Sequence, residues 1–223
     1  MSVRLSDNLD LIATAPAGIQ KMHGLIYEIA ARGMLDGDIA LPARSVKLGE
    51  VAEFVMGQAP PGTECNTNGV GMIFVKTGEF GEPFPVVREW TTKPLKFAKR
   101  GDVLICVVGA TVGKLNLAID CAIGRSVAAI RPCSDLETRY LHTEVSPFPG
   151  AVDMDYLYLW FNSPQFMGAI NPGRSNGIPH ISTKQVGDLP FVRYSLREQH
   201  RIVAKVDELM ALVDRLKANL ADS

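Results

Sequence analysis

The chain lacks the signals that several classes of protein need. Its four cysteines, Cys65, Cys106, Cys121 and Cys133, are scattered and form no C-x-x-C pair. A disulfide framework or a zinc site is therefore not expected, and we predict no metal and no cofactor. The N-terminal residues contain no uninterrupted apolar core of a secretory signal, and no apolar run approaches the length of a membrane span. These absences predict a cytoplasmic protein with reduced thiols.

Recognisable catalytic motifs are missing as well. No two histidines have the spacing of metal ligands, and neither a G-x-S-x-G nor a G-x-G-x-x-G motif occurs. Residues 109–114 (GATVGK) resemble a phosphate loop, but only three residues separate the glycines, and Leu115 stands where magnesium binding needs a serine or threonine. We expect a glycine-bearing turn between strands here. Asp153 and Asp155 precede an aromatic run and are expected to cap a helix. Nothing among these motifs supports a catalytic centre.

A strong charge of one sign is also absent. The sequence has 23 Lys and Arg against 24 Asp and Glu, which gives a formal net charge of −1. This balance argues against a protein that holds nucleic acid through a basic surface alone. With 223 residues, 47% of them hydrophobic and 21% charged, the composition suits a globular protein of one or two units.

A heptad pattern marks the C-terminal stretch, residues 196–220. Its apolar residues recur in alternating steps of four and three, at Ile202, Val206, Leu209, Val213, Leu216 and Leu220. This spacing predicts a long helix that packs lengthwise on another helix. Ser195 followed by Glu198 predicts a capping box at the start of the helix. An ordinary terminal helix packed on its own domain would explain the same spacing.

A shorter pattern of the same kind runs from residue 19 to residue 33 and predicts a second helix with a lengthwise seam. The two helices could pack on each other, on a symmetry mate or on another protein. Between them, residues 46–132 contain short β-branched runs separated by Gly, Pro and Asn, which predict strands and turns. Residues 153–170 are predicted to be helical, and residues 171–180 a long loop. The predicted fold is a mixed α/β (α+β) domain flanked by long coiled-coil-forming helices.

Two stretches between the helices have the chemistry of nucleic-acid contact. Residues 88–100 form the densest basic segment, with two aromatic residues interleaved. Lysine and arginine there would contact phosphates, although a charge run is commonly just a solvated edge. Residues 173–180 (GRSNGIPH) contain no acid, two glycines and several hydrogen-bond donors. Arginine suits the edge of guanine and asparagine that of adenine, but a plain linker is the alternative.

Several stretches, taken in order, resemble the specificity subunits of type I restriction–modification systems. Residues 101–114 (GDVLICVVGATVGK) are similar to the family's Gly-Asp strand and its Gly-Ala-x-x-Gly-Lys turn, which accounts for the incomplete phosphate loop. The other stretches that carry the resemblance are residues 25–35, 46–57, 156–166, 177–181 and 189–202. Together they cover nearly the whole chain.

The resemblance implies a non-catalytic protein with three regions: an N-terminal helical conserved region at 1–44, a target recognition domain at 45–195 and a C-terminal long coiled-coil helix at 196–223. Each recognition domain in the family reads one half of a split double-stranded DNA target. The helices space two such domains apart and dock methyltransferase (M) subunits, through which the restriction (R) subunit joins. This chain has room for one recognition domain only. It is then either a half-subunit that forms a homodimer through its C-terminal helix or a fragment of a longer chain.

Residue roles are assigned by side-chain chemistry, because the resemblance does not locate them. The base-edge candidates are Arg174, Asn176 and His180, with Lys76 and Thr77 as secondary ones. The phosphate candidates are Lys93, Lys96, Lys99 and Arg125. The alternative function is a helical assembly module that reads no DNA, and a weaker alternative is a nucleotide-binding enzyme that uses residues 109–114.

Overall fold

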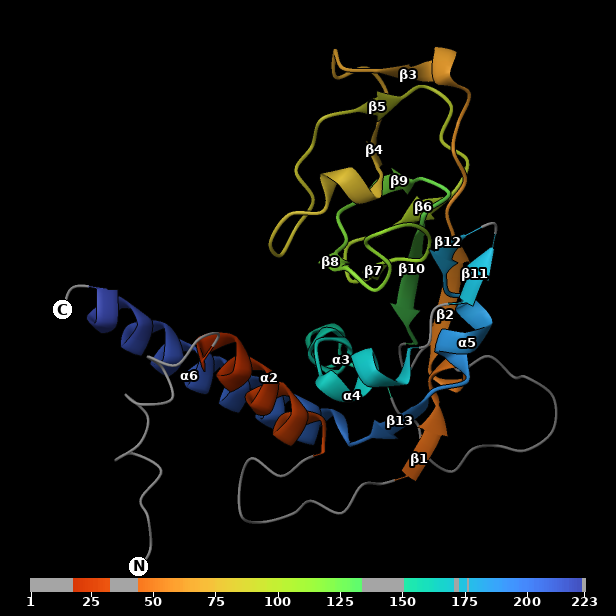
Figure 1. Cartoon of the computed structure of the whole chain (residues 1–223). Coiled ribbons are helices and arrows are strands. Elements are labelled where there is room, and N and C mark those ends of the chain that lie inside the picture. Colours follow the sequence, from red (N-terminus) through yellow and green to blue (C-terminus); the bar gives the residue numbers. More distant parts are fainter. Residues whose placement is uncertain (1–17, 33–43, 134–150, 171–172, 176, 222–223) are drawn as a thin grey trace, which may run out of the picture.

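The computed structural model describes residues 18–32, 44–133, 151–170, 173–175 and 177–221, and it has the mixed α and β content that the sequence predicts. Figure 1 shows a body rich in strands and, extending from its lower side, a pair of helices, α2 (Gly18–Ala31) and α6 (Leu196–Ala221). Within the described ranges no helix combines the length and the apolar character needed to cross a bilayer.

The central sheet has the order β2-β10-β7-β8, and all its neighbouring strands are antiparallel. Its strands are β2 (Ala52–Met56), β7 (Val103–Cys106), β8 (Leu115–Leu117) and β10 (Val127–Pro132). Every residue of β7 is buried, which explains why its sequence is continuously apolar. Successive side chains point to opposite faces of a strand. Val103 and Ile105 accordingly join one hydrophobic cluster, whereas Leu104 and Cys106 join the other.

The outer sheet has the order β3-β5-β4-β9-β6. Its strands are β3 (Cys65–Asn66), β4 (Met72–Val75), β5 (Trp90–Thr91), β6 (Phe97–Ala98) and β9 (Cys121–Ile123). The pair β4–β9 is parallel, and the other pairs are antiparallel. The smaller hydrophobic cluster combines Val75 and Ile123 of this sheet with Leu104 and Ala129 of the central sheet. The two sheets therefore share one core.

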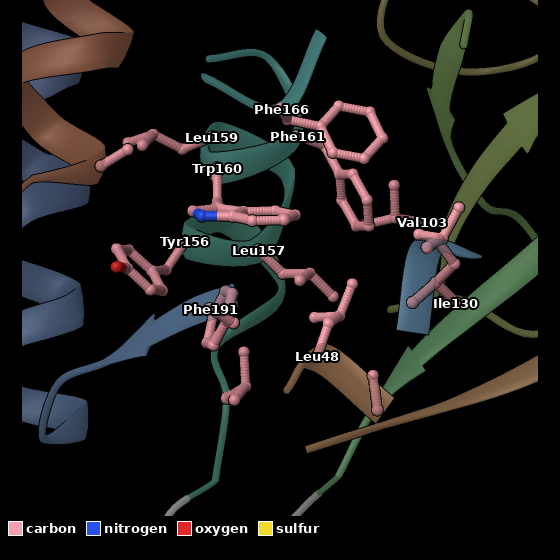
Figure 2. Packing of buried hydrophobic residues seen from close by; sticks show 14 of the residues in the cluster. Leu48, Val103, Ile130, Tyr156, Leu157, Leu159, Trp160, Phe161, Phe166 and Phe191 are labelled. Carbon is pink, nitrogen blue, oxygen red and sulfur yellow. The ribbon is translucent and has the colours of Figure 1, made fainter. Parts of the chain in front are cut away.

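An aromatic core lies on the other face of the central sheet (Figure 2). Trp160 of α3 (Met154–Phe161) makes edge contacts with Phe161 and Phe191, whose ring centroids lie 5.2 and 5.3 Å away. Asp153 caps α3, as predicted, by accepting a hydrogen bond from the amide of Tyr156 at 3.0 Å. The predicted single helix is interrupted, because Ser163 caps a separate helix, α4 (Pro164–Ala169), with a proline in its first turn.

A two-stranded sheet brings the two ends of the body together. β1 (Arg44–Lys47) pairs antiparallel with β13 (Pro190–Arg193), and β13 leads directly into α6. The 3-10 turn η2 (Leu48–Glu50) follows β1, and the short helix α5 (Thr183–Gly187) packs against it. The body therefore begins and ends beside the base of the helix pair, as Figure 1 shows.

The helices α2 and α6 lie side by side and run in opposite directions (Figure 1). His23 Nε2 and Asp214 Oδ1 are 4.0 Å apart across the pair. At the start of α6, the Ser195 hydroxyl accepts a hydrogen bond from the Glu198 amide at 3.3 Å. Three of the predicted seam residues are buried: Ile202, Val206 and Val213. Leu209 and Leu216 are half-buried, and the side chain of Leu220 lies outside the described part of the structure. The seam is therefore covered within the chain.

The predicted loop at residues 171–180 is in fact largely a β-hairpin. β11 (Gly173–Ser175) and β12 (Ile178–His180) pair antiparallel, with Ser175 opposite Ile178. Gly177, directly before β12, adopts a positive φ of 80°. The Asn-Gly sequence between two short runs is a typical hairpin signal, so the expectation of a loop was wrong for a reason visible in the sequence.

Candidate nucleic-acid interface

Strands from both sheets and the hairpin end side by side at one edge of the body. The amide of Gly124, in the turn between β9 and β10, donates to the carbonyl of Val75 at the end of β4, at 2.9 Å. The amide of Val107, just after β7, donates to the carbonyl of Ser126 at 2.9 Å. Ile181, just after β12, donates in turn to the carbonyl of Val107 at 2.9 Å. These three bonds fix the order of four backbone segments along the edge.

The order of these backbone segments determines where four residues lie along the edge. Lys76 comes directly after Val75, and Arg125 lies between Gly124 and Ser126. The isolated bridge between Val108 and His180 then joins the end of β7 to the hairpin. Lys76, Arg125, Val108 and His180 therefore follow one another in space along the edge, although they are far apart in the sequence.

The phosphate-loop-like turn holds the hairpin in place. The Gly109 amide donates to the Pro179 carbonyl at 2.9 Å, and Gly109 adopts a φ of 106°, which favours glycine. Lys114 closes the turn, and its Nζ donates to the carbonyl of Phe80 at 2.9 Å. The segment therefore links β7 to β8, as predicted, and its lysine is already bonded to protein.

The cations at this edge differ in their partners. Lys76 donates to the carboxylate of Glu89, and this hydrogen bond raises the pKa of Lys76 above its ordinary value. Its stem runs past Gly124, whose added Cβ would lie 3.1 Å from Lys76 Cγ. The Arg125 side chain is exposed and forms no hydrogen bond or ion pair with any described residue. Arg125 is therefore available to an anion, whereas Lys76 would first have to share or leave Glu89.

Apolar side chains are exposed between the cations and the hairpin. Val108 is 38% exposed and Ile178 is 51% exposed. The isolated bridge places Val108 opposite His180, and Ile178 lies two residues before His180 on the same face of β12. Neither residue is predicted from the sequence, because Val108 follows a buried strand and Ile178 lies in a stretch with the composition of a polar loop.

The other predicted residues are placed unevenly around this edge. Thr77 starts the 3-10 turn η4 (Thr77–Glu79) directly after Lys76. The carbonyl of Lys96 accepts from the Ile123 amide at 3.0 Å, which sets Lys96 at the Arg125 end of β9. Lys99 lies at the opposite end of β9, because β6 is antiparallel to β9. Lys93 lies further out, where its amide donates to the Thr91 hydroxyl at 3.1 Å.

The hairpin residues are described only in part. Arg174 lies in β11, but its side chain is outside the described part of the structure, and Asn176 is outside it altogether. Nδ1 of His180 is buried and has no hydrogen-bond partner among the described residues. The roles of these three residues therefore stay predictions. Among the residues that the structure describes, no group of three or more His, Cys, Asp or Glu side chains is placed to hold a metal ion.

Comparison with known proteins points to one kind of protein. No protein-family model matches the chain. It is 43% identical over 70 residues to the type I restriction enzyme EcoAI specificity subunit of Escherichia coli, a match covering 31% of this chain and 12% of that protein. It is 33% identical over 144 residues to a protein described as the type I restriction enzyme MjaX specificity subunit of Methanocaldococcus jannaschii, with coverage of 57% and 34%.

A solved structure extends the likeness to the whole fold. The crystal structure of the HsdS subunit from Thermoanaerobacter tengcongensis matches with a TM-score of 0.66 and 30% identity, over 97% of this chain and 49% of that chain. This chain thus spans about half the length of that subunit and about a third or less of the two curated relatives. The resemblance seen in the sequence is confirmed by both sequence and fold.

Proposed function

We propose that this chain, a relative of the specificity subunits of type I restriction–modification enzymes, reads one half of a bipartite DNA target. It is a specificity component and leaves the chemistry to other subunits. The observation that carries this proposal is the edge where Lys76, Arg125 and the hairpin of β11 and β12 meet. Three residues chosen by side-chain chemistry from three separate stretches of sequence, Lys76, Arg125 and His180, lie there in one row.

The side chains at this edge suit the major groove of DNA. An exposed arginine such as Arg125 binds phosphate, and such contacts fix the register of a protein on the duplex. Exposed apolar side chains such as Val108 and Ile178 suit the methyl group of thymine. A two-stranded ribbon such as β11–β12 is narrow enough to enter the groove. We retain Arg174, Asn176 and His180 as base-reading residues.

The near-neutral charge of the chain fits a component that shares the work of binding DNA. With a net charge of −1, it gains little from non-specific attraction. Methyltransferase subunits would supply further phosphate contacts and, through them, the restriction subunit would join. We place the docking surface for the methyltransferase on the helix pair of α2 and α6, which extends from the body. This role would place the protein in the cytoplasm, with the DNA.

A second half-site needs a second recognition unit. We propose that a second copy of this chain supplies it, through the exposed face of the helix pair rather than through the buried seam. Leu212 is 47% exposed on α6, and it lies two residues before Asp214, which is paired with His23 of α2, so it lies on the side of α6 that α2 leaves open. A two-fold dimer would read an interrupted palindrome, and the helices would set the gap between its halves.

The test is selection of bound duplexes from a randomised double-stranded DNA library by the full chain, repeated with Arg174→Ala and Lys96→Ala. Enrichment of a bipartite sequence is expected for the wild type. Arg174→Ala should weaken binding to that sequence by about 1–3 kcal/mol. Lys96→Ala should weaken binding to all duplexes alike and lower the salt dependence. A wild type that enriches no sequence would refute DNA readout and favour the helical assembly module.

A further inference from the structure

Lys76 and Glu89 form an ion pair at the edge of the interface. The Glu89 carbonyl accepts a hydrogen bond from the amide of Phe74, in β4, at 2.8 Å. Because Phe74 is two residues before Lys76, this bond places Glu89 beside the end of β4. Its carboxylate accepts a hydrogen bond from Lys76 Nζ. The side chains are 47% exposed for Lys76 and 21% exposed for Glu89. Both charged groups are thus within reach of a molecule that docks on this edge.

The pair is held in a fixed position from several sides. The backbone amide of Lys76 donates to the buried carboxylate of Glu79 at 2.9 Å, which anchors the start of η4. The lysine ammonium lies 5.7 Å from the centroid of the Phe74 ring, close enough for a cation–π contact. Gly124 leaves room for the lysine stem, since an added Cβ there would lie 3.1 Å from Lys76 Cγ. A long side chain held in this way loses little freedom when it binds a partner.

Resting on the proposed function, we propose that Lys76 and Glu89 act as one unit that reads a C·G base pair. Guanine presents two acceptors, N7 and O6, to the major groove, and its cytosine presents the N4 amino donor beside them. The ammonium matches the acceptors and the carboxylate matches the donor. In an A·T pair the single donor lies between two acceptors, which would repel a carboxylate placed against it.

Glu89 also separates this unit from an ordinary phosphate contact. An unpaired lysine at a DNA-binding edge takes any phosphate and adds to non-specific binding. A carboxylate hydrogen-bonded to that lysine repels the phosphate, so the pair gains little from the DNA backbone. Only a ligand that offers both an acceptor and a donor satisfies the two groups together. Glu89, which residue-by-residue assignment of cations overlooks, therefore becomes a determinant of specificity.

The test uses the full chain and a randomised double-stranded DNA library, with the variants Glu89→Gln, Lys76→Met and the double variant. Glu208→Gln is the matched control, because it removes the same charge from the exposed Lys205–Glu208 pair on α6. For the wild type and the control, one position of the enriched sequence should be C·G. In each single variant, the preference at that position alone should fall by about tenfold or more. The double variant should lose no more than either single variant, because the two residues work as a unit.

A second readout separates specificity from attraction. On random-sequence duplex, Glu89→Gln frees the lysine for phosphate, so log K should fall more steeply with log salt, by about one further contact. The inference is overturned if Glu89→Gln keeps every base preference, or if the position lost is an A·T pair. If the wild type enriches no sequence, the proposed function fails and this inference fails with it. If the wild type enriches a sequence that Glu89→Gln and Lys76→Met both preserve, this inference alone fails.

Discussion

Gln199 of α6 accepts a hydrogen bond from the backbone amide of Asp153, with 2.7 Å between Oε1 and the nitrogen. The amide nitrogen of the same side chain donates to the carbonyls of Tyr194, at 2.8 Å, and Ala151, at 3.1 Å. Gln199 is fully buried. One side chain therefore satisfies three backbone groups and fixes the start of the long helix against the start of α3.

Replacement of Gln199 by leucine should destabilise the fold strongly. The apolar side chain leaves three polar backbone groups without this partner, and each buried unsatisfied group costs about 1–3 kcal/mol. We expect the free energy of unfolding to fall by roughly 3 kcal/mol or more, measured by urea denaturation. Gln165→Leu, at an exposed position of α4, should change it by less than about 0.5 kcal/mol. Equal effects of the two variants would refute the role given to Gln199.

The two helices offer a contrast between a buried and an exposed apolar residue. Ile202→Ala should lower the free energy of unfolding by about 2–5 kcal/mol, because it opens a cavity in the main core. Leu212 is 47% exposed, so Leu212→Ala should change stability by less than about 0.5 kcal/mol. It should nevertheless weaken self-association, measured as molar mass by light scattering. A dimer that Leu212→Ala leaves intact would place the contact elsewhere.

Arg125 and Lys99 lie at opposite ends of β9 and test the position of the interface. Arg125→Ala should weaken binding to random duplex DNA and reduce the slope of log K against log salt by about one phosphate contact. Lys99→Ala removes the same charge away from the hairpin and should leave the slope unchanged. Binding is measured by fluorescence anisotropy over a series of salt concentrations. A larger effect of Lys99→Ala would move the interface to the far end of the outer sheet.

Gly109 has the backbone conformation that the hairpin attachment requires. Gly109→Ala meets no atom within 4 Å, but its φ of 106° is strained for alanine, at a cost of about 1–3 kcal/mol. We expect lower stability in urea and faster proteolytic cleavage within residues 173–180. Gly168→Ala, in α4 and also free of close neighbours, should leave stability equal or slightly higher. A hairpin that resists protease in Gly109→Ala would show that the Gly109 turn does not hold it.

Burial raises the pKa of the Cys121 thiol to about 12, from an ordinary value of 9.0. The folded protein thus keeps this proton while the unfolded chain loses it, so the contribution of Cys121 to stability falls as pH rises from about 9 to 12. Below that window Cys121 should resist alkylation until urea unfolds the chain, whereas the less buried Cys65 should react earlier. Mass spectrometry of labelled peptides distinguishes the two. Labelling of Cys121 in native protein at pH 8 would contradict its placement.

Local signals in the sequence predicted local structure well. The heptad spacing predicted the helix of α6, and the position of Asp153 before an aromatic run predicted its role as a cap, because both depend on residues a few positions apart. The split between α3 and α4 and the hairpin at residues 173–180 were also encoded locally, by Ser163-Pro164 and Asn176-Gly177. The predictions missed them by giving too little weight to these turn residues.

The arrangement of the candidate interface depends on strand order, which no local pattern specifies. Lys76 and Arg125 meet because β4 pairs in parallel with β9, and the hairpin joins them through Val108. The predicted basic segment, in contrast, is divided along β9, with Lys96 near Arg125 and Lys99 at the other end. Side-chain chemistry suggested which residues to consider, and only the sheet topology determines which of them act together.

The alternation along β7 has a consequence for how the molecule responds to damage. Val103 and Leu104 are neighbours in sequence, yet their side chains pack into different hydrophobic clusters. β7 is therefore shared by both clusters. The buried residues Val75, Cys121 and Ile123 of the outer sheet belong to the cluster that contains Leu104 of this strand. A substitution in the aromatic core can therefore destabilise the interface without contacting it. Loss of packing in either cluster also destabilises the other through β7.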